Sequence, residues 1–267
     1  MLRDITLGQY YQADSVIHKL DPRAKLVATI AFIISLFVVN NAVGYLVAAI
    51  FLAVVIKLSK VPFRFIVKGM KTIVFLLLIT VVFNLFLTPG EALVTVWKIT
   101  ITREGLRTAV LMAVRLIFLI IGSSVMTLTT TPNNLTDGME RLMRPLKIFR
   151  IPVHEVAMMM SIALRFIPVL LEETDKIMKA QIARGADFES GNLIKKAKSL
   201  VPLLVPLFIS AFRRANDLAM AMEARCYRGG EHRTKMKPLK YKRCDGIAYF
   251  VLVCYLGACI GIRIITG

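Results

Sequence analysis

The chain has 267 residues, 57% of them hydrophobic, and its 35 Lys and Arg side chains outnumber 17 Asp and Glu side chains, giving a net charge of +18. A mean hydropathy of +0.67 and long uncharged runs argue against an ordinary soluble domain, in which about half of the residues are apolar. The excess positive charge fits the Lys and Arg bias of cytoplasmic loops in membrane proteins better than a nucleic-acid surface.

Residues 1–25 are polar and mixed in charge and lack the apolar core of a signal peptide. We expect them to form a cytoplasmic segment ahead of membrane helices in residues 26–130. The first apolar run, residues 26–56, carries no charge, and as one helix it would be about 46 Å long, more than a bilayer core of about 30 Å requires. Asn40, Asn41 and Gly44 near its middle therefore predict a turn between two short spans.

Residues 72–88 form the next uncharged run and predict a third span that ends at Pro89 and Gly90. Residues 91–107 alternate β-branched side chains and include Trp97, which predicts an external connection near the membrane interface. Residues 108–130 predict a fourth span carrying Arg115. A charge within a span either serves function or faces the bundle interior, and both interpretations stay open for Arg115.

Residues 131–243 are charged but keep apolar residues at helical spacing. They predict a cytoplasmic domain with one short helix after Pro132 and two long amphipathic helices, 153–184 and 193–225, which cross or pair. A fifth span lies within residues 244–267, so the N-terminus is expected in the cytoplasm and the C-terminus outside. The predicted fold class is an all-α integral membrane protein with about five transmembrane helices.

Each long helix carries an apolar stripe with a seven-residue repeat that leads to an arginine. The stripe of the first helix contains Val156, Ala163, Leu170 and Ile177 before Arg184, and that of the second contains Leu204, Ala211 and Leu218 before Arg225. A cation at a helix C-terminus complements the helix dipole, and Gly185 suits the left-handed position that follows. Alternatively, each arginine enters a pocket on another protein and binds a carboxylate there.

The motifs of nucleotide hydrolysis and metal catalysis are missing from the sequence. It contains no phosphate-binding loop and no H-E-x-x-H, and the four cysteines lack zinc-type spacing. We therefore expect a chain that is not an enzyme, with no catalytic residue, no metal site and no cofactor of its own.

Several segments resemble one family, the transmembrane T-components (EcfT) of energy-coupling factor (ECF) transporters. They are "HKLDPRAKL" (18–26), "RPLKIFRIPVHEVAMMMSIALRFIPVLLEE" (144–173), "AQIARG" (180–185) and "AMEARCYRGG" (221–230). The resemblance implies a scaffold that couples two ABC-type ATPase subunits, expected to form a heterodimer, to one membrane-embedded substrate-binding S-component for vitamin or micronutrient uptake. It places ATP and Mg in the ATPase subunits and makes the two long cytoplasmic helices the coupling helices. The protein would lie in a prokaryotic cell membrane, with no nucleic acid among its partners.

The resemblance also assigns residues. The ATPase-coupling residues are Ala183, Arg184, Gly185, Ala224, Arg225 and Cys226, and the stripe residues proposed to contact the S-component are Met159, Met160, Ala163, Leu170, Ile177, Leu204, Ala211, Leu218 and Met222. Cys226 stands where the family motif has glycine, so we expect the arginine role to carry over, the glycine role to be lost, and Gly229 and Gly230 to stop the helix. The alternative function, a stand-alone permease with its own substrate path, predicts polar residues facing a midplane cavity.

Overall fold

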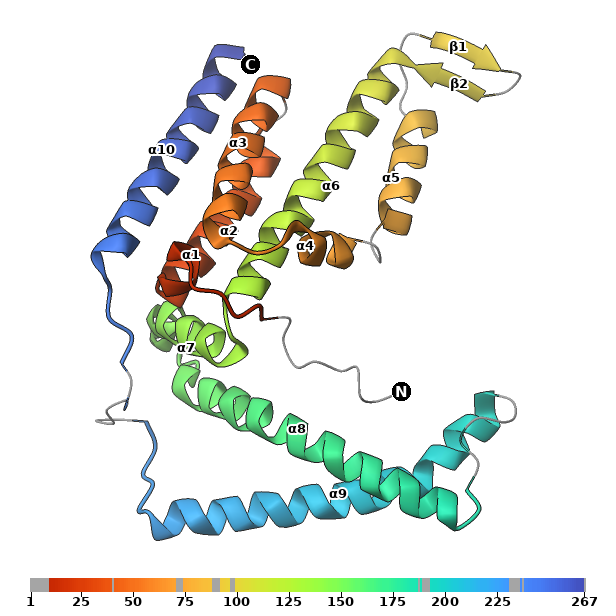
Figure 1. Ribbon diagram of the computed structural model, residues 1–267, viewed down its shortest axis with the longest axis vertical. Helices are drawn as coiled ribbons and strands as arrows, with labels where there is room; N and C mark the ends of the chain where they lie inside the picture. The colour runs from red at the N-terminus through yellow and green to blue at the C-terminus, as the bar shows by residue number, and fades with distance from the viewer. Residues whose placement is uncertain are drawn as a thin grey trace. The chain divides into compact units, whose positions relative to one another are not determined.

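The computed structural model describes residues 10–39, 41–70, 74–87, 92–96, 99–186, 188, 193–230, 236 and 238–266. Its contacts divide the chain into two units, which we call the bundle unit (Gly8–Leu142 with Leu239–Gly267) and the long-helix unit (Met143–Pro238). Figure 1 shows the elements of each unit. Helices make up nearly all of the described secondary structure, so the predicted all-α membrane fold is confirmed, with one short β-hairpin added.

The bundle unit contains eight α-helices and one β-hairpin among its described residues. The helices are α1 (Val16–Lys19), α2 (Pro22–Val38), α3 (Ala42–Ser59), α4 (Phe63–Met70), α5 (Val74–Leu87), α6 (Arg103–Thr129), α7 (Pro132–Leu142) and α10 (Arg243–Thr266), and the strands are β1 (Ala92–Val96) and β2 (Ile99–Thr102). The described part of the long-helix unit contains the 3₁₀ helix η2 (Arg144–Phe149) and the helices α8 (Val153–Ala183) and α9 (Leu193–Ala224).

The first two long helices of the bundle unit form the predicted hairpin. Asp21 caps α2 by accepting a 2.9 Å hydrogen bond from the Arg23 amide, and Pro22 occupies the first helical position, where its missing N–H is not needed. The chain leaves α2 after Val38 and re-enters a helix at Ala42. The break therefore falls where the paired asparagines predict it, although Asn40 itself lies outside the described residues.

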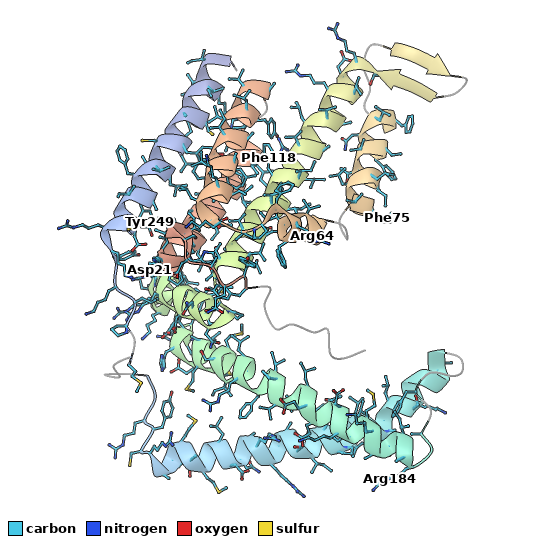
Figure 2. All side chains as sticks on the ribbon, viewed as in Figure 1. Asp21, Arg64, Phe75, Phe118, Arg184 and Tyr249 are labelled. Carbon is cyan, nitrogen blue, oxygen red and sulfur yellow. The ribbon has the colours of Figure 1, made fainter. Side chains whose placement is uncertain are left out.

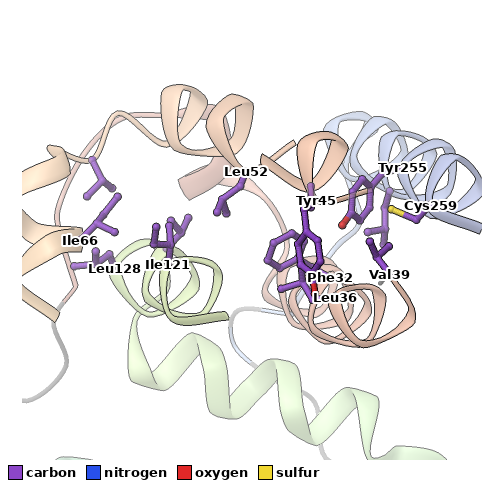
Figure 3. Close-up of a cluster of buried hydrophobic side chains, with 14 residues drawn as sticks. Phe32, Leu36, Val39, Tyr45, Leu52, Ile66, Ile121, Leu128, Tyr255 and Cys259 are labelled. Atoms are coloured by element: carbon purple, nitrogen blue, oxygen red, sulfur yellow. The ribbon is translucent and has the colours of Figure 1, made fainter. Parts of the chain in front are cut away.

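Helices α2, α3, α6 and α10 bury a common hydrophobic core, part of which Figure 3 shows. Phe51 stacks on Tyr255 with ring centroids 4.3 Å apart. The Tyr255 hydroxyl also shares a 2.8 Å hydrogen bond with the Ser35 hydroxyl, so the polar tip of this buried ring has a partner. The C-terminal helix is thus fastened to the first hairpin by both stacking and hydrogen bonding.

A buried carboxylate joins the start of α10 to the start of α2. Asp245 is 1% exposed and accepts hydrogen bonds of 2.7 Å each from the backbone amides of Asp21 and Lys242. The neighbouring Lys25 ammonium donates to the Thr129 carbonyl at 2.8 Å, which ties α2 to the end of α6. Buried charges are stable only with such partners, so this cluster fixes how three helices begin or end.

Four described helices are long and apolar enough to cross a membrane by length and composition: α3, α6, α8 and α10. Helix α2, with 17 residues, and α5, with 14, are shorter, and rise about 26 and 21 Å. Of the five predicted spans, α3, α6 and α10 therefore meet these criteria, and α2 and α5 do not. Helix α8, which was predicted to be cytoplasmic, also meets the criteria, although its second half carries Glu172, Glu173, Asp175, Lys176 and Lys179.

Two elements of the bundle unit were not predicted as such. The strands β1 and β2 pair antiparallel in the predicted interfacial connection, whose Trp97 lies outside the described residues. Helix α4 follows the first hairpin, in a segment that the sequence analysis treated only as a basic flank of that hairpin. It buries Ile66 completely while Phe63 and Phe65 remain exposed.

Arg115 faces the interior of the bundle unit. Its Nε donates to the Tyr45 hydroxyl at 2.8 Å, and its Nη2 donates to the Val39 carbonyl at 3.3 Å. The Val39 carbonyl lies just beyond the end of α2, where backbone acceptors lack intrahelical donors. Of the two interpretations of Arg115, the structural one therefore accounts for its contacts.

Candidate functional site: two arginine-capped helix ends

The end of α8 is a Schellman motif, a helix stop closed by two backbone hydrogen bonds around a left-handed residue. The Ala186 amide donates to the Gln181 carbonyl at 3.0 Å, and the Gly185 amide donates to the Ile182 carbonyl at 2.9 Å. Gly185 takes the left-handed conformation with φ +87°. Arg184 is the C-cap residue and its side chain is exposed.

The end of α9 has the same hydrogen-bonding pattern. The Tyr227 amide donates to the Met222 carbonyl at 3.0 Å, and the Cys226 amide donates to the Glu223 carbonyl at 2.8 Å. Cys226 takes the left-handed conformation with φ +54°. Arg225 follows the last helical residue, as Arg184 does in α8, and is also exposed.

The expectation that the glycine role is lost in the second motif, and that Gly229 and Gly230 stop the helix, is wrong. Helix α9 ends at Ala224, ahead of both glycines, and Cys226 adopts the left-handed conformation that glycine adopts in α8. Gly230 instead lies against the His154 ring at the start of α8, where a Cβ atom would overlap the ring. The two backbone hydrogen bonds therefore impose the stop without glycine.

The two arginines lie at well-separated ends of the long-helix unit. Figure 2 shows Arg184 at the C-terminal end of α8. Helix α9 crosses α8 near that end and then continues to the opposite side of the unit, where it stops (Figure 1). Each arginine is therefore presented alone at the tip of its own helix.

A polar bridge holds the crossing point together. Glu173 on α8 accepts hydrogen bonds from the Ser210 hydroxyl and, at 2.9 Å, from the Arg214 guanidinium, both on α9. The hydrogen bond from Ser210 is the largest cause that lowers the pKa of the Glu173 carboxyl. Burial opposes it, and the hydrogen bond and charge of Arg214 lower the pKa further. Glu173 is therefore ionised at neutral pH and clamps α9 at two positions one turn apart.

A second contact depends on a proline. Pro206 has no N–H, so the Pro202 carbonyl four residues earlier loses its helical donor. The Gln181 side-chain amide of α8 donates to that carbonyl at 3.1 Å. The proline thus leaves an acceptor on α9 to which α8 donates.

The predicted stripe residues lie at the crossing only in part. Leu170, Ile177, Ala211, Leu218 and Met222 are half-buried, whereas Met159, Met160, Ala163 and Leu204 are exposed. On α9 the most buried apolar residue is Leu203, at 6% exposure, while Leu204 is 45% exposed. The helices therefore cross, and the predicted stripe on α9 is half-buried at Ala211, Leu218 and Met222 but exposed at Leu204.

An apolar strip on α9 is open to solvent. Its members are apolar side chains between 45% and 67% exposed: Val201, Leu204, Val205, Phe208, Ile209 and Phe212. Contiguous exposed apolar surface of this kind marks an interaction site or contact with lipid. The exposed Met159 and Met160 on α8 add flexible side chains that adapt to partner surfaces.

Two cavities of the bundle unit differ in polarity, one being lined mainly by apolar residues and the other mainly by polar and charged ones. One has a volume of about 230 Å³ and is enclosed by α1, α2, α3, α6 and α10, and its few polar linings are Lys25, Thr29, Thr129 and Cys244. An open pocket beside Arg107 and Arg115 shares no lining residue with it. Among the described residues, no group of three His, Cys, Asp or Glu side chains could hold a metal ion.

The comparisons with known proteins agree with one another. The family model described as cobalt transport protein (CbiQ) matches residues 13–236. The energy-coupling factor transporter transmembrane protein EcfT of Clostridium kluyveri is 59% identical over 259 residues, covering 95% of this chain and 96% of the relative. The EcfT proteins of Thermosediminibacter oceani and Bacillus subtilis are 54% and 47% identical, covering 93% and 92% of this chain and 94% and 93% of the relatives.

The chain belongs to the EcfT family. It is therefore a multi-pass transmembrane component of an energy-coupling factor transporter. The Glu173 bridge and the Asp245 cluster of this EcfT chain were not predicted from the sequence. Ser210 lies 37 residues from Glu173, and Asp21 lies 224 residues from Asp245. A charged residue on the half-buried face of an amphipathic helix is the one local signal that could have indicated Glu173.

Proposed function

We propose that this chain is the coupling and scaffold subunit of an ECF-type importer. It passes ATP-driven movement from two ATPase subunits to a membrane-embedded S-component that binds a vitamin or another micronutrient. The observation that carries the proposal is the pair of exposed arginines at equivalent C-cap positions of two crossed helices.

Each arginine is suited to a carboxylate-lined groove. The guanidinium is planar and permanently charged, and it binds a carboxylate through two parallel hydrogen bonds. Ala183 and Ala224, just before the arginines, are exposed and small, so a partner surface can approach the backbone of either tip. Because the tips lie far apart within the unit, each serves a separate ATPase subunit.

The crossing converts motion of the tips into motion of the apolar strip. The bridge from Glu173 to Ser210 and Arg214 fixes the two helices at one place and leaves their ends free to move as levers. When the ATPase subunits bind ATP and Mg and approach each other, the tips move and the crossing angle changes, a rigid-body change at interfaces. The open apolar strip on α9, with Met159 and Met160, then carries this change to the S-component.

The proposal includes an orientation in the cell membrane. The basic side chains that flank the first hairpin, among them Arg23, Lys57, Lys60 and Arg64, favour a cytoplasmic location for both of its ends. This places the N-terminus and the long-helix unit in the cytoplasm and the end of α10 outside. The S-component binds the transported solute and determines its identity, so this coupling subunit is compatible with different vitamins or metal ions.

Co-purification of the ATPase subunits with the membrane-embedded chain tests the role of the arginines. The double variant Arg184→Ala with Arg225→Ala is expected to lose ATPase binding by at least about 30-fold, because truncating one partner of a buried charge pair costs about 2–5 kcal/mol. Arg213→Ala is the matched control, since Arg213 is an exposed arginine in the middle of α9. Full recovery of both ATPase subunits with the double variant would contradict the proposed docking role.

A further inference from the structure

The short helix η2 carries an exposed apolar pair beside a set of cations. Ile148 is 84% exposed and Phe149 is 77% exposed. Arg144, Lys147 and Arg150 are also exposed. Two large apolar side chains so fully in solvent are unfavourable unless another apolar phase receives them.

The 3₁₀ geometry separates these two kinds of side chain. Side chains three residues apart share one edge of a 3₁₀ helix, so Arg144 and Lys147 lie along one edge while Pro145 and Ile148 lie along the next. Arg150 follows as the C-cap residue in the left-handed conformation, φ 60°, with its amide bonded to the Lys147 carbonyl at 3.0 Å. The segment is therefore a short amphipathic element with a basic edge.

The backbone holds this element in place. The Leu146 amide donates to the Met143 carbonyl at 2.9 Å, and Leu146 is half-buried. Beyond η2, Val153 begins α8 and is 3% exposed. The exposed pair thus projects from a short hydrogen-bonded turn that leads into the buried start of α8.

We propose that η2 is a membrane-surface anchor, in which Ile148 and Phe149 enter the interfacial region of the bilayer while Arg144, Lys147 and Arg150 bind anionic lipid headgroups. Charge complementarity supports this partner, because residues 141–154 contain four Lys and Arg side chains and no carboxylate. Such a combination of apolar and basic side chains is typical of interfacial anchors. Along the chain, η2 follows the candidate membrane span α6, which ends at Thr129, with only α7 between them.

A protein partner fits these features less well. A stable protein interface buries about 800 Å² on each side, far more than one pair of side chains on a six-residue helix supplies. The pair is instead the size of an interfacial wedge flanked by cations. The anchor would hold the start of α8 at the bilayer while its far end, at Arg184, remains free to move.

The single tryptophan of the chain allows a direct test. The variant Phe149→Trp in a Trp97→Phe background places one fluorophore at the exposed position of η2. The full chain is reconstituted into nanodiscs of brominated phosphatidylcholine, with or without phosphatidylglycerol. The control is Asn216→Trp in the same background, because Asn216 is exposed and polar on α9.

The Phe149→Trp chain is expected to show blue-shifted emission and quenching by brominated lipid at least about twofold stronger than the Asn216→Trp chain, most strongly with phosphatidylglycerol at low salt. Adding Arg144→Gln and Lys147→Gln should abolish the part of the quenching that depends on phosphatidylglycerol. Water-like emission from the Phe149→Trp chain in both lipid mixtures would overturn the proposal, as would quenching that ignores lipid charge and both glutamine substitutions. Emission that shifts only when ATPase subunits or an S-component are added would overturn it in favour of a protein contact.

Discussion

The ends of α8 and α9 adopt one backbone geometry with different residues at its left-handed position. Gly185 has φ +87° and Cys226 has φ +54°, yet both helices stop with the same pair of backbone hydrogen bonds. The arginine before that position is common to both ends, and the glycine is not. The comparison separates two roles: the hydrogen-bonded stop fixes where the arginine points, and the identity of the next residue sets how much strain the stop contains.

The largest expected effect comes from removing the arginines one at a time. Because the two ends are equivalent in geometry and exposure, Arg184→Ala and Arg225→Ala should each weaken ATPase binding by about 2–5 kcal/mol, within a factor of about three of each other in affinity. Titration of purified ATPase subunits onto the chain in nanodiscs measures both losses. A loss confined to one arginine would show that matching backbone geometry does not imply matching function.

The bridge at the crossing has the next largest effect. Glu173→Ala leaves Ser210 and Arg214 without their acceptor and should lower the free energy of unfolding by about 1 kcal/mol, a small value because the pair is partly exposed to solvent. Thermal unfolding of the detergent-solubilised chain measures it. Glu172→Ala, at the exposed neighbour on the same helix, is the control and should change little.

The same bridge predicts a pH dependence. The folded pKa of Glu173 lies below the ordinary value of 4.5 because Ser210 and Arg214 favour the carboxylate. Its contribution to stability is therefore fully present above the ordinary value and is lost as the pH falls through the folded pKa. Unfolding midpoints recorded from neutral pH down to acid should converge for the native chain and Glu173→Gln. A gap between them that stays constant over this range would contradict the ionised bridge.

Gly185→Ala should destabilise the end of α8 by about 1 kcal/mol, because a Cβ atom is strained at positive φ. Nothing lies within 4 Å of the added Cβ, so strain in the backbone conformation is the expected cause rather than a clash. Thermal unfolding is the measurement. Ala186→Gly, one residue beyond the left-handed position, is the control and should not reproduce this loss.

Local patterns predicted the parts of the fold that depend on neighbouring residues. The cap at Asp21, the hairpin break before Asn41 and the extents of α8 and α9 all follow from short-range capping, turn and periodicity rules. The β-hairpin, whose alternating residues were assigned only to an interfacial connection, shows that alternation alone does not define a pairing register.

The parts that could not be predicted depend on distant partners or unusual backbone. Asp245 and Glu173 acquire their roles from residues on other helices. The burial of Leu203 in place of Leu204 was not predicted, because a heptad count along one helix does not contain the geometry of the crossing. Glycine is the residue usually found at a left-handed position, so the sequence predicted that α9 would not stop at Cys226.

The smallest expected effect comes from substituting Cys226, and it tests the comparison of the two helix ends most directly. Cys226→Gly should raise the free energy of unfolding by about 0.5–1 kcal/mol, because glycine adopts φ +54° without the steric strain that a Cβ atom introduces. Cys226→Ala keeps a Cβ atom and should leave the unfolding temperature nearly unchanged. If alanine stabilises the chain as much as glycine does, the thiol rather than the backbone distinguishes the two ends. If glycine alone stabilises it, and ATPase binding is unchanged, then Arg225 acts independently of the residue that follows it, as the matching hydrogen bonds of the two ends imply.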